Sequence, residues 1–294
     1  MTPRAKGILS ITASAFGFAL MAFFVRLCDD FGDGVSCFQK SFFRNVIAFA
    51  IAFSVLAAER RHGRTTRFGG NRGKALLHLL LRSIFGTIGI FANFYALSRI
   101  PIGEAMMLNK TAPFFTVLFS WMFIGEKVSA RQAAVLAVAF VGAAFVVKPG
   151  FGGGLPSLVA LAGGLGAGAA YSSVHILGKM GFDSAKTVLF FSAFSCLASI
   201  PPAAASYVPM TAAQTAILAL AGCGAAIGQF GVTAAYRYAE PRSIAVYDYT
   251  NVVFTSLFGF FFFDQIPDAF SLVGFVVIFS AAVFAVRGNG RNMV

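Results

Sequence analysis

The clearest candidates for chemistry in this sequence are two charged residues that lie inside apolar runs. Lys110 lies within the run Ala105–Trp121, and Asp248 lies within the similar run Ser243–Leu257, 138 positions further along. A charge at the depth of a membrane's hydrocarbon costs a few kcal/mol, and such residues usually face a bundle interior or a water-filled cavity. We therefore expect Lys110 to bind an anionic group of a substrate, and Asp248 to bind an amine or a coupling proton.

Two further ionisable residues lie in apolar runs at similar expected depths. Arg44 is placed near the depth of Lys110, and a pair of cations there would favour a carboxylate or a phosphate. The alternative is that Arg44 holds loop carbonyls or an acid at the outer surface. His175 is placed near the depth of Asp248, and histidine titrates close to physiological pH. It is a candidate for a proton relay with Asp248, with a structural hydrogen bond as the alternative.

The elements that must position these residues are membrane-spanning helices. Of the 294 residues, 58% are hydrophobic and only 12% are charged, so a soluble core of ordinary size cannot bury the apolar surface. Long continuous runs indicate helices rather than a barrel, whose strands would alternate polar and apolar residues. A span needs roughly 20 apolar residues. About ten such runs occur, near 7–26, 36–57, 75–97, 104–123, 131–147, 156–178, 187–207, 213–236, 243–263 and 269–286.

The charges between these runs predict the orientation of an all-α integral membrane protein. With the N-terminus inside, sixteen of the 23 Lys and Arg residues fall on the side of the termini and three on the opposite side. The positive-inside rule therefore predicts that both termini are cytoplasmic. The basic loop Glu59–Lys74 accounts for much of the net charge of +12, and we expect it to contact anionic lipid head groups rather than nucleic acid.

The halves 1–150 and 151–294 repeat one pattern of residues. The matched pairs are Gly17 with Gly166 at an offset of 149, Gly89 with Gly228 at 139, and Lys110 with Asp248 at 138. Each half holds five expected spans, an odd number, so the halves must enter the membrane in opposite orientations. Inverted repeats are typical of secondary transporters, whose site lies between the repeats. A duplication without transport is the alternative.

The geometry of straight helices limits what Lys110 and Asp248 can do together. At ~1.5 Å per residue, straight fourth and ninth spans would separate them by ~13 Å along the membrane normal. The sequence therefore predicts no direct ion pair. Pro113 is expected to kink the fourth span and to free a backbone carbonyl one turn back, close to Lys110. Asn251 stands at the equivalent place in the ninth span, so no kink is expected there.

Short motifs run through both halves: Ala96-Leu97, Ala105, Asn109, Pro113, Gly125-Glu126 and Gly142 in the first, and Ala234-Ala235-Tyr236, Asp248-Tyr249-Thr250, Phe254 and Asp264 in the second. Together they resemble the ten-helix EamA-type members of the drug/metabolite transporter superfamily. The resemblance implies transport through a central cavity between the halves. It does not specify the ligand, because members carry amino acids, amines, nucleosides and other metabolites.

The resemblance also implies which helices line the cavity, and several polar residues lie on them. These further candidates for substrate binding are Asn93, Tyr95, Tyr171, Gln229 and Tyr236. The alternative for each is a satisfied hydrogen bond between helices.

An enzyme reading has no motif to support it. The three histidines, His62, His78 and His175, form no zinc motif, and the sequence has no phosphate-binding glycine loop or nucleophile elbow. We expect neither catalysis nor a cofactor.

We expect instead a secondary transporter of the plasma (inner) membrane that works by alternating access. Its substrate is expected to be a small carboxylate-bearing metabolite, with an amino acid or a related amphoteric compound favoured. The expected partners are membrane lipids and H⁺ as the coupling ion, and a homodimer is compatible with the sequence. One alternative is an exporter of organic cations, amines or drugs with the same fold. Another is a channel or a non-transporting subunit of a membrane complex.

Overall fold

The computed structural model describes residues 2–61, 70–119, 122, 130–147, 154–238 and 247–288. Within these ranges the chain consists of helices joined by turns, with no strand. The elements are α1 (Pro3–Leu27), η1 (Cys28–Phe31), α2 (Cys37–Arg61), α3 (Arg72–Leu97), α4 (Ile102–Asn109), α5 (Ala112–Phe119), α6 (Ala130–Val147), α7 (Gly154–Lys179), α8 (Ser184–Ala205), α9 (Ala212–Tyr238), α11 (Thr250–Phe263) and α12 (Ala269–Gly288).

The helices follow the apolar runs of the sequence. Six of them, α1, α2, α3, α7, α8 and α9, contain stretches that are long and apolar enough to cross a membrane. The apolar stretches within α6, α11 and α12 are shorter. The described residues are therefore those of a helical membrane protein, as the composition predicts.

Polar side chains define where several helices begin. Asn71 precedes α3 and its side chain accepts a hydrogen bond from the backbone N–H of Lys74 at 3.0 Å. Asp183 precedes α8 and accepts one from the N–H of Ala185 at 2.8 Å. Such caps satisfy backbone donors that have no partner within the helix.

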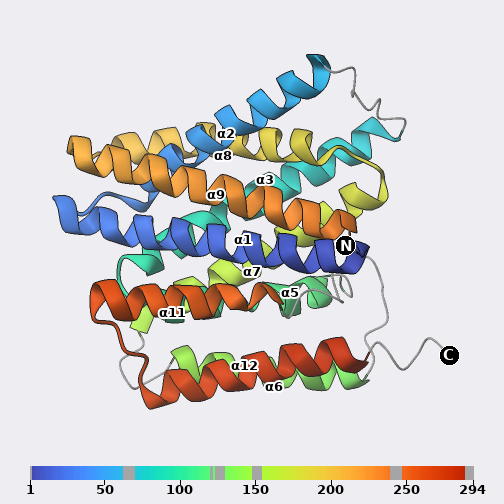
Figure 1. Cartoon of the computed structure of the whole chain (residues 1–294), viewed down its shortest axis with the longest axis vertical. Helices are drawn as coiled ribbons and strands as arrows, with labels where there is room; N and C mark the ends of the chain where they lie inside the picture. The colour runs from blue at the N-terminus through green and yellow to red at the C-terminus, as the bar shows by residue number, and fades with distance from the viewer. Residues whose placement is uncertain are drawn as a thin grey trace.

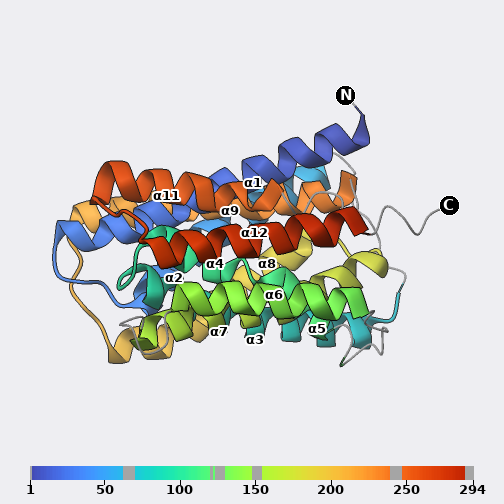
Figure 2. The ribbon, with the colours of Figure 1, turned by 90° about the horizontal axis from the view of Figure 1, so that it is seen from below.

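The helices lie side by side with their long axes roughly aligned (Figures 1 and 2). In this bundle α1 packs along α9, α3 along α7, α2 along α8, and α6 along α12. The start of α1 and the end of α12 lie at one end of the bundle, which we call the terminal end (Figure 1). The turn between α1 and α2, residues 28–36, lies at the other end, which we call the loop end.

Glycines bring two helix pairs into backbone contact. A Cβ atom at Gly17 of α1 would lie 2.7 Å from the backbone N of Gly228 in α9. A Cβ atom at Gly166 of α7 would lie 2.9 Å from the carbonyl of Phe85 in α3, next to Gly89. Any side chain would push these helices apart, so the α1–α9 and α3–α7 crossings both require glycine.

The fourth apolar run is broken at Lys110 and Thr111, between α4 and α5. The Lys110 N–H still donates to the Met106 carbonyl at 2.9 Å, but the Phe114 N–H donates to Thr111 rather than to Lys110. Pro113 has no N–H to continue the ladder. The predicted break near Pro113 is confirmed, and it leaves the Lys110 carbonyl without a partner in its own helix.

The ninth run is also interrupted, which the sequence analysis did not expect. A turn at Tyr249 precedes α11, which begins only at Thr250. The Thr250 hydroxyl donates to the Tyr247 carbonyl at 2.7 Å, and such local side-chain bonds compete with the helical ladder. The Asn251 side chain, which replaces a proline, donates to the Ala15 carbonyl of α1 at 2.7 Å. A break therefore needs no proline here.

Candidate functional site

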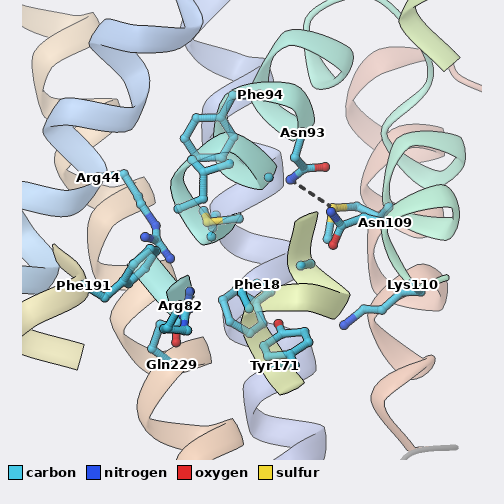
Figure 3. Close-up of a pocket in the computed structure, with 17 residues that line it drawn as sticks. Phe18, Arg44, Arg82, Asn93, Phe94, Asn109, Lys110, Tyr171, Phe191 and Gln229 are labelled. Carbon is cyan, nitrogen blue, oxygen red and sulfur yellow. Dashed lines mark hydrogen bonds between the residues drawn. The ribbon is translucent and has the colours of Figure 1, made fainter. Parts of the chain in front are cut away.

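A cavity of about 80 Å³ lies in the interior of the bundle, among α1, α2, α3, α4, α7, α8 and α9. Its apolar wall includes Phe18, Ile90, Phe94, Met106 and Phe191. Its polar lining consists of Arg44, Arg82, Asn93, Asn109, Lys110, Tyr171 and Gln229 (Figure 3). Three cations therefore face one small interior space.

Lys110 forms an ion pair with Asp248, with its Nζ 2.7 Å from Asp248 Oδ2. The two side chains are 9% and 20% exposed. A second bond joins the same segments, because the buried Tyr249 hydroxyl donates to the free Lys110 carbonyl at 3.0 Å. The breaks in the two helices thus meet each other beside the cavity.

The predicted absence of a Lys110–Asp248 ion pair is wrong. The ~13 Å separation assumed two straight, continuous helices and measured only the rise along their axes. Both helices are broken at these residues. The estimate also left out the lysine's flexible four-carbon stem, which carries its charge away from the backbone.

Lys110 uses only part of its hydrogen-bonding capacity. An ammonium group has three donors, and Asp248 is the one acceptor that Lys110 Nζ has among the described residues. Its Nζ also lies 5.9 Å from the centre of the Phe18 ring. The remaining donors are available to a ligand in the cavity.

Arg44 and Arg82 lie on the other side of the cavity in Figure 3, against the ring of Phe191. The central guanidinium carbon lies 3.9 Å from the ring centre for Arg82 and 5.8 Å for Arg44. Arg82 is only 6% exposed and Arg44 only 2%. Arg44 Nη1 donates to Asn45 Oδ1 at 2.5 Å, while the Nε atoms of both arginines have no partner among the described residues. Neither arginine pairs with a carboxylate in the described part of the chain.

The alternative that Arg44 holds loop carbonyls or an outer acid does not match its contacts. Lys40, one turn earlier on α2, has that position instead. Its Nζ lies 2.6 and 2.7 Å from the two carboxylate oxygens of Asp29 and 2.7 Å from Ser98 Oγ. These bonds tie η1, α2 and the end of α3 together at the loop end.

The other predicted site residues separate into three groups. Asn93, Tyr171 and Gln229 line the cavity, and the side-chain oxygen of Asn93 has no partner in the part of the chain that the structure describes. Tyr95 does not line it, because its ring stacks on the Arg99 guanidinium at 3.8 Å. The side chains of His175 and Tyr236 lie outside the described residues.

Arg82 and Asn109 are polar residues of the cavity that the sequence analysis did not name as site candidates, and Arg82 is the charged one. Arg82 lies inside the expected span 75–97, but it was not singled out there. The available signal was Gly86, four residues later and therefore on the same helix face. A Cβ atom at Gly86 would overlap the guanidinium of Arg82, so glycine leaves the room that the arginine occupies.

The electrostatics of the cavity favour an anion. Three buried or nearly buried cations surround it, and Asp248 is the only carboxylate paired with any of them in the described residues. Buried charges are costly unless they are paired. A guanidinium presents a planar fork that matches a carboxylate, and a lysine presents a point charge.

Comparison with known proteins identifies the family of this chain. The profile of the EamA-like transporter family matches residues 5–148. The pseudopaline exporter of Pseudomonas aeruginosa (strain UCBPP-PA14) is 32% identical over 208 residues, which cover 70% of this chain and 73% of the exporter. The chain belongs to the EamA-like transporter family.

Two further comparisons extend the match to nearly the whole chain. An S-adenosylmethionine uptake transporter of Rickettsia bellii is 24% identical over 265 residues, covering 89% of this chain and 88% of that protein. A solved crystal structure aligns with 97% of this chain and 99% of its own, with a TM-score of 0.63 and 18% identity, so it shares the fold. The chain is thus a multi-pass membrane transporter of small molecules and not an enzyme, within the drug/metabolite transporter superfamily that its motifs resemble.

Proposed function

We propose that this protein is a secondary transporter of the plasma membrane that moves a small carboxylate-bearing metabolite, favouring an amphoteric compound of the amino-acid class. The observation that carries the proposal is the Lys110–Asp248 pair beside the cavity, with spare donors on the lysine. A substrate carboxylate takes a place on Lys110, and Asp248 receives the substrate's amine or a coupling proton. Charged residues at membrane depth are commonly placed for such functions.

The arrangement of the helices supports two related halves, 1–150 and 151–294, inserted in opposite orientations. By position in the two halves, α1 is equivalent to α7 and α3 is equivalent to α9. The packed pair α1–α9 therefore has the packed pair α7–α3 as its equivalent. The glycine contacts are repeated in the same way, since Gly17 and Gly228 are the equivalents of Gly166 and Gly89. Lys110 and Asp248 are themselves equivalent positions, and they touch. Equivalent residues touch each other when they lie close to an approximate two-fold axis that relates the two halves.

In this proposal the chain crosses the membrane ten times, with both termini in the cytoplasm. The fourth crossing consists of α4 and α5, and the ninth contains α11. Broken helices beside a central site are typical of secondary transporters built from inverted repeats.

The size of the cavity supports alternating access. A cavity of about 80 Å³ is small, whereas sites for ligands of drug size occupy roughly 300–1,000 Å³. At the loop end, Lys40 pairs with Asp29, and Gln39 exchanges two hydrogen bonds with the backbone of Val208 at 2.9 and 3.0 Å. We take this as a state that is contracted around the site and closed at the loop end. Substrate entry then requires one half to rock against the other.

The relatives support the substrate class in one respect. The Rickettsia bellii relative is named for uptake of S-adenosylmethionine, a compound that carries a carboxylate and an amine. A lysine next to an aspartate is suited to that pair of groups.

The test is uptake of labelled amino acids, organic acids, amines and nucleosides into proteoliposomes containing wild type, Lys110→Ala or Lys110→Arg. We expect a carboxylate compound to be carried by wild type, lost in Lys110→Ala and partly retained in Lys110→Arg. Saturable counterflow distinguishes a carrier from a channel. A pH gradient that drives uptake in wild type and not in Asp248→Asn assigns the coupling proton to Asp248. Equal transport of an organic cation by wild type and Lys110→Ala would contradict the proposal and favour the amine exporter.

A further inference from the structure

The two arginines on Phe191 are not explained by a site built on Lys110 and Asp248 alone. Among the described residues, their one hydrogen bond is between Arg44 and the neighbouring Asn45. Arg82 has no hydrogen-bond partner there, and it is held against the Phe191 ring. A role in stability would call for a carboxylate partner, because a buried guanidinium without one is costly.

The surroundings of the pair are built to hold two guanidinium groups side by side. Gly86 leaves space for Arg82, and Phe191 presents the face of its ring to both arginines. Asn45, which accepts from Arg44, is itself fixed by its side-chain donation to the Ser41 carbonyl at 2.8 Å. Arginines whose positions are fixed before binding lose little freedom when a ligand arrives.

We propose that Arg44 and Arg82 form a second anion subsite, across the cavity from Lys110, so that the substrate carries two carboxylates. One carboxylate is held by Lys110 and the other by the two guanidinium groups, while Asp248 receives an amine. The substrate class is then a compact amino-dicarboxylate, of which acidic amino acids are the simplest members. This inference rests on the proposed function and narrows it.

The class follows from the charges around the cavity. Arg44, Arg82 and Lys110 line the cavity as cations, and Asp248 lies beside it as the carboxylate partner of Lys110. A ligand with two carboxylates and one amine can pair every one of these four groups. A monocarboxylate amino acid would leave both arginines buried and unpaired, and buried groups left without partners are what allow a polar site to reject an analogue.

The experiment compares isosteric ligands that differ in the second carboxylate alone: glutamate against glutamine, and aspartate against asparagine. Purified wild type, Arg82→Gln, Arg44→Gln and Arg82→Lys are compared by ligand-induced shift of the thermal midpoint and by uptake into proteoliposomes. Arg99→Gln is the matched control, because Arg99 is exposed and lies outside the cavity.

We expect wild type and Arg99→Gln to bind an acidic amino acid at least about tenfold more tightly than its amide. In Arg82→Gln and Arg44→Gln that preference falls to about one, through loss of the acid and not of the amide. Arg82→Lys keeps the positive charge but lacks the planar guanidinium group, so it is expected to retain part of the preference for acid over amide. Without ligand, Arg82→Gln unfolds at a temperature no lower than wild type, since the substitution removes an unpaired buried charge.

A lower midpoint for ligand-free Arg82→Gln, with an unchanged preference for acid over amide, would show that Arg82 is structural and would overturn the subsite. Absence of any midpoint shift with either acid in wild type would overturn it as well. The proposed function fails separately, when wild type transports no carboxylate compound at all. In that event a midpoint shift that distinguishes acid from amide, and that Arg82→Gln abolishes, still supports the subsite.

Discussion

Two of the lysine–aspartate pairs among the described residues, Lys40–Asp29 and Lys110–Asp248, lie in different surroundings. Lys40 is fully buried, and three acceptors, the two oxygens of Asp29 and Ser98 Oγ, match its three donors. Lys110 meets a single acceptor on Asp248, whose side chain is 20% exposed. Lys40 has no donor left for a ligand, and its bonds tie the loop end together. The second pair retains donors on its lysine and lies beside the cavity. In our proposal, the same two residue types therefore serve structure in one place and binding in the other.

Breaking the loop-end pair is expected to have the largest effect. Asp29→Ala leaves Lys40 buried without its counter-ion, and we expect a loss of about 3–5 kcal/mol in the free energy of unfolding. Chemical denaturation in detergent micelles measures it, with Asp248→Ala as the matched variant of the other pair. Equal stability losses in the two variants would contradict the distinction between them.

Removing the cavity lysine tests the opposite half of the comparison. Lys110→Gln is expected to lower kcat/KM for a carboxylate substrate by about 30-fold or more, the equivalent of about 2 kcal/mol. Its unfolding free energy is expected to stay closer to wild type than that of Asp29→Ala, because Asp248 is partly exposed. Transport kinetics and denaturation on the same preparation give both values. A variant that unfolds early yet transports with unchanged kcat/KM would assign Lys110 to the scaffold.

Neutralising Asp248 sharpens the assignment of its role. In Asp248→Asn the lysine has no competing anion, so a carboxylate that lacks an amine should bind about tenfold more tightly. An amino acid should gain nothing, because its amine loses its partner. Competition of an organic acid and an amino acid with a labelled substrate measures the ratio. Equal gains for both compounds would mean that Asp248 does not contact the amine.

The smallest expected effect concerns the contact between the two helix breaks. Tyr249→Phe removes the hydrogen bond to the Lys110 carbonyl and should cost about 1 kcal/mol of unfolding free energy. Substrate affinity should be unchanged, since the hydroxyl lies outside the cavity lining. Tyr247→Phe is the control, because Tyr247 is exposed. A loss of affinity in Tyr249→Phe alone would place this contact within the site.

The sequence predicts the helices and one of the two breaks for simple reasons. Apolar runs mark helices because backbone groups in a membrane must be satisfied internally, and Pro113 marks a break because it lacks an N–H. The break at Tyr249 has no such marker in the sequence. It is accompanied instead by side-chain hydrogen bonds from Thr250 and Asn251.

The members of the cavity were predictable by residue type more than by geometry. Lys110, Arg44, Asn93, Tyr171 and Gln229 are polar residues in apolar runs, and the structure brings them to one cavity. Tyr95 has the same signature but faces Arg99, because which side of a helix faces the interior depends on how the helices pack. The Lys110–Asp248 contact was missed because the straight-helix estimate excluded the break that permits it.

The glycine contacts between α1 and α9 and between α3 and α7 bear on which contacts must break when the protein changes conformation. At Gly17 and Gly228, and at Gly89 and Gly166, backbones meet without intervening side chains. Two helices in contact at such a point can change their crossing angle while few interlocked side chains separate, so each crossing is suited to be a pivot. In the alternating access proposed above, the barrier to opening would then lie mainly at the ends of the bundle. Substitutions such as those at Asp29 should therefore alter how often the protein opens, and substitutions at the pivots should alter how far.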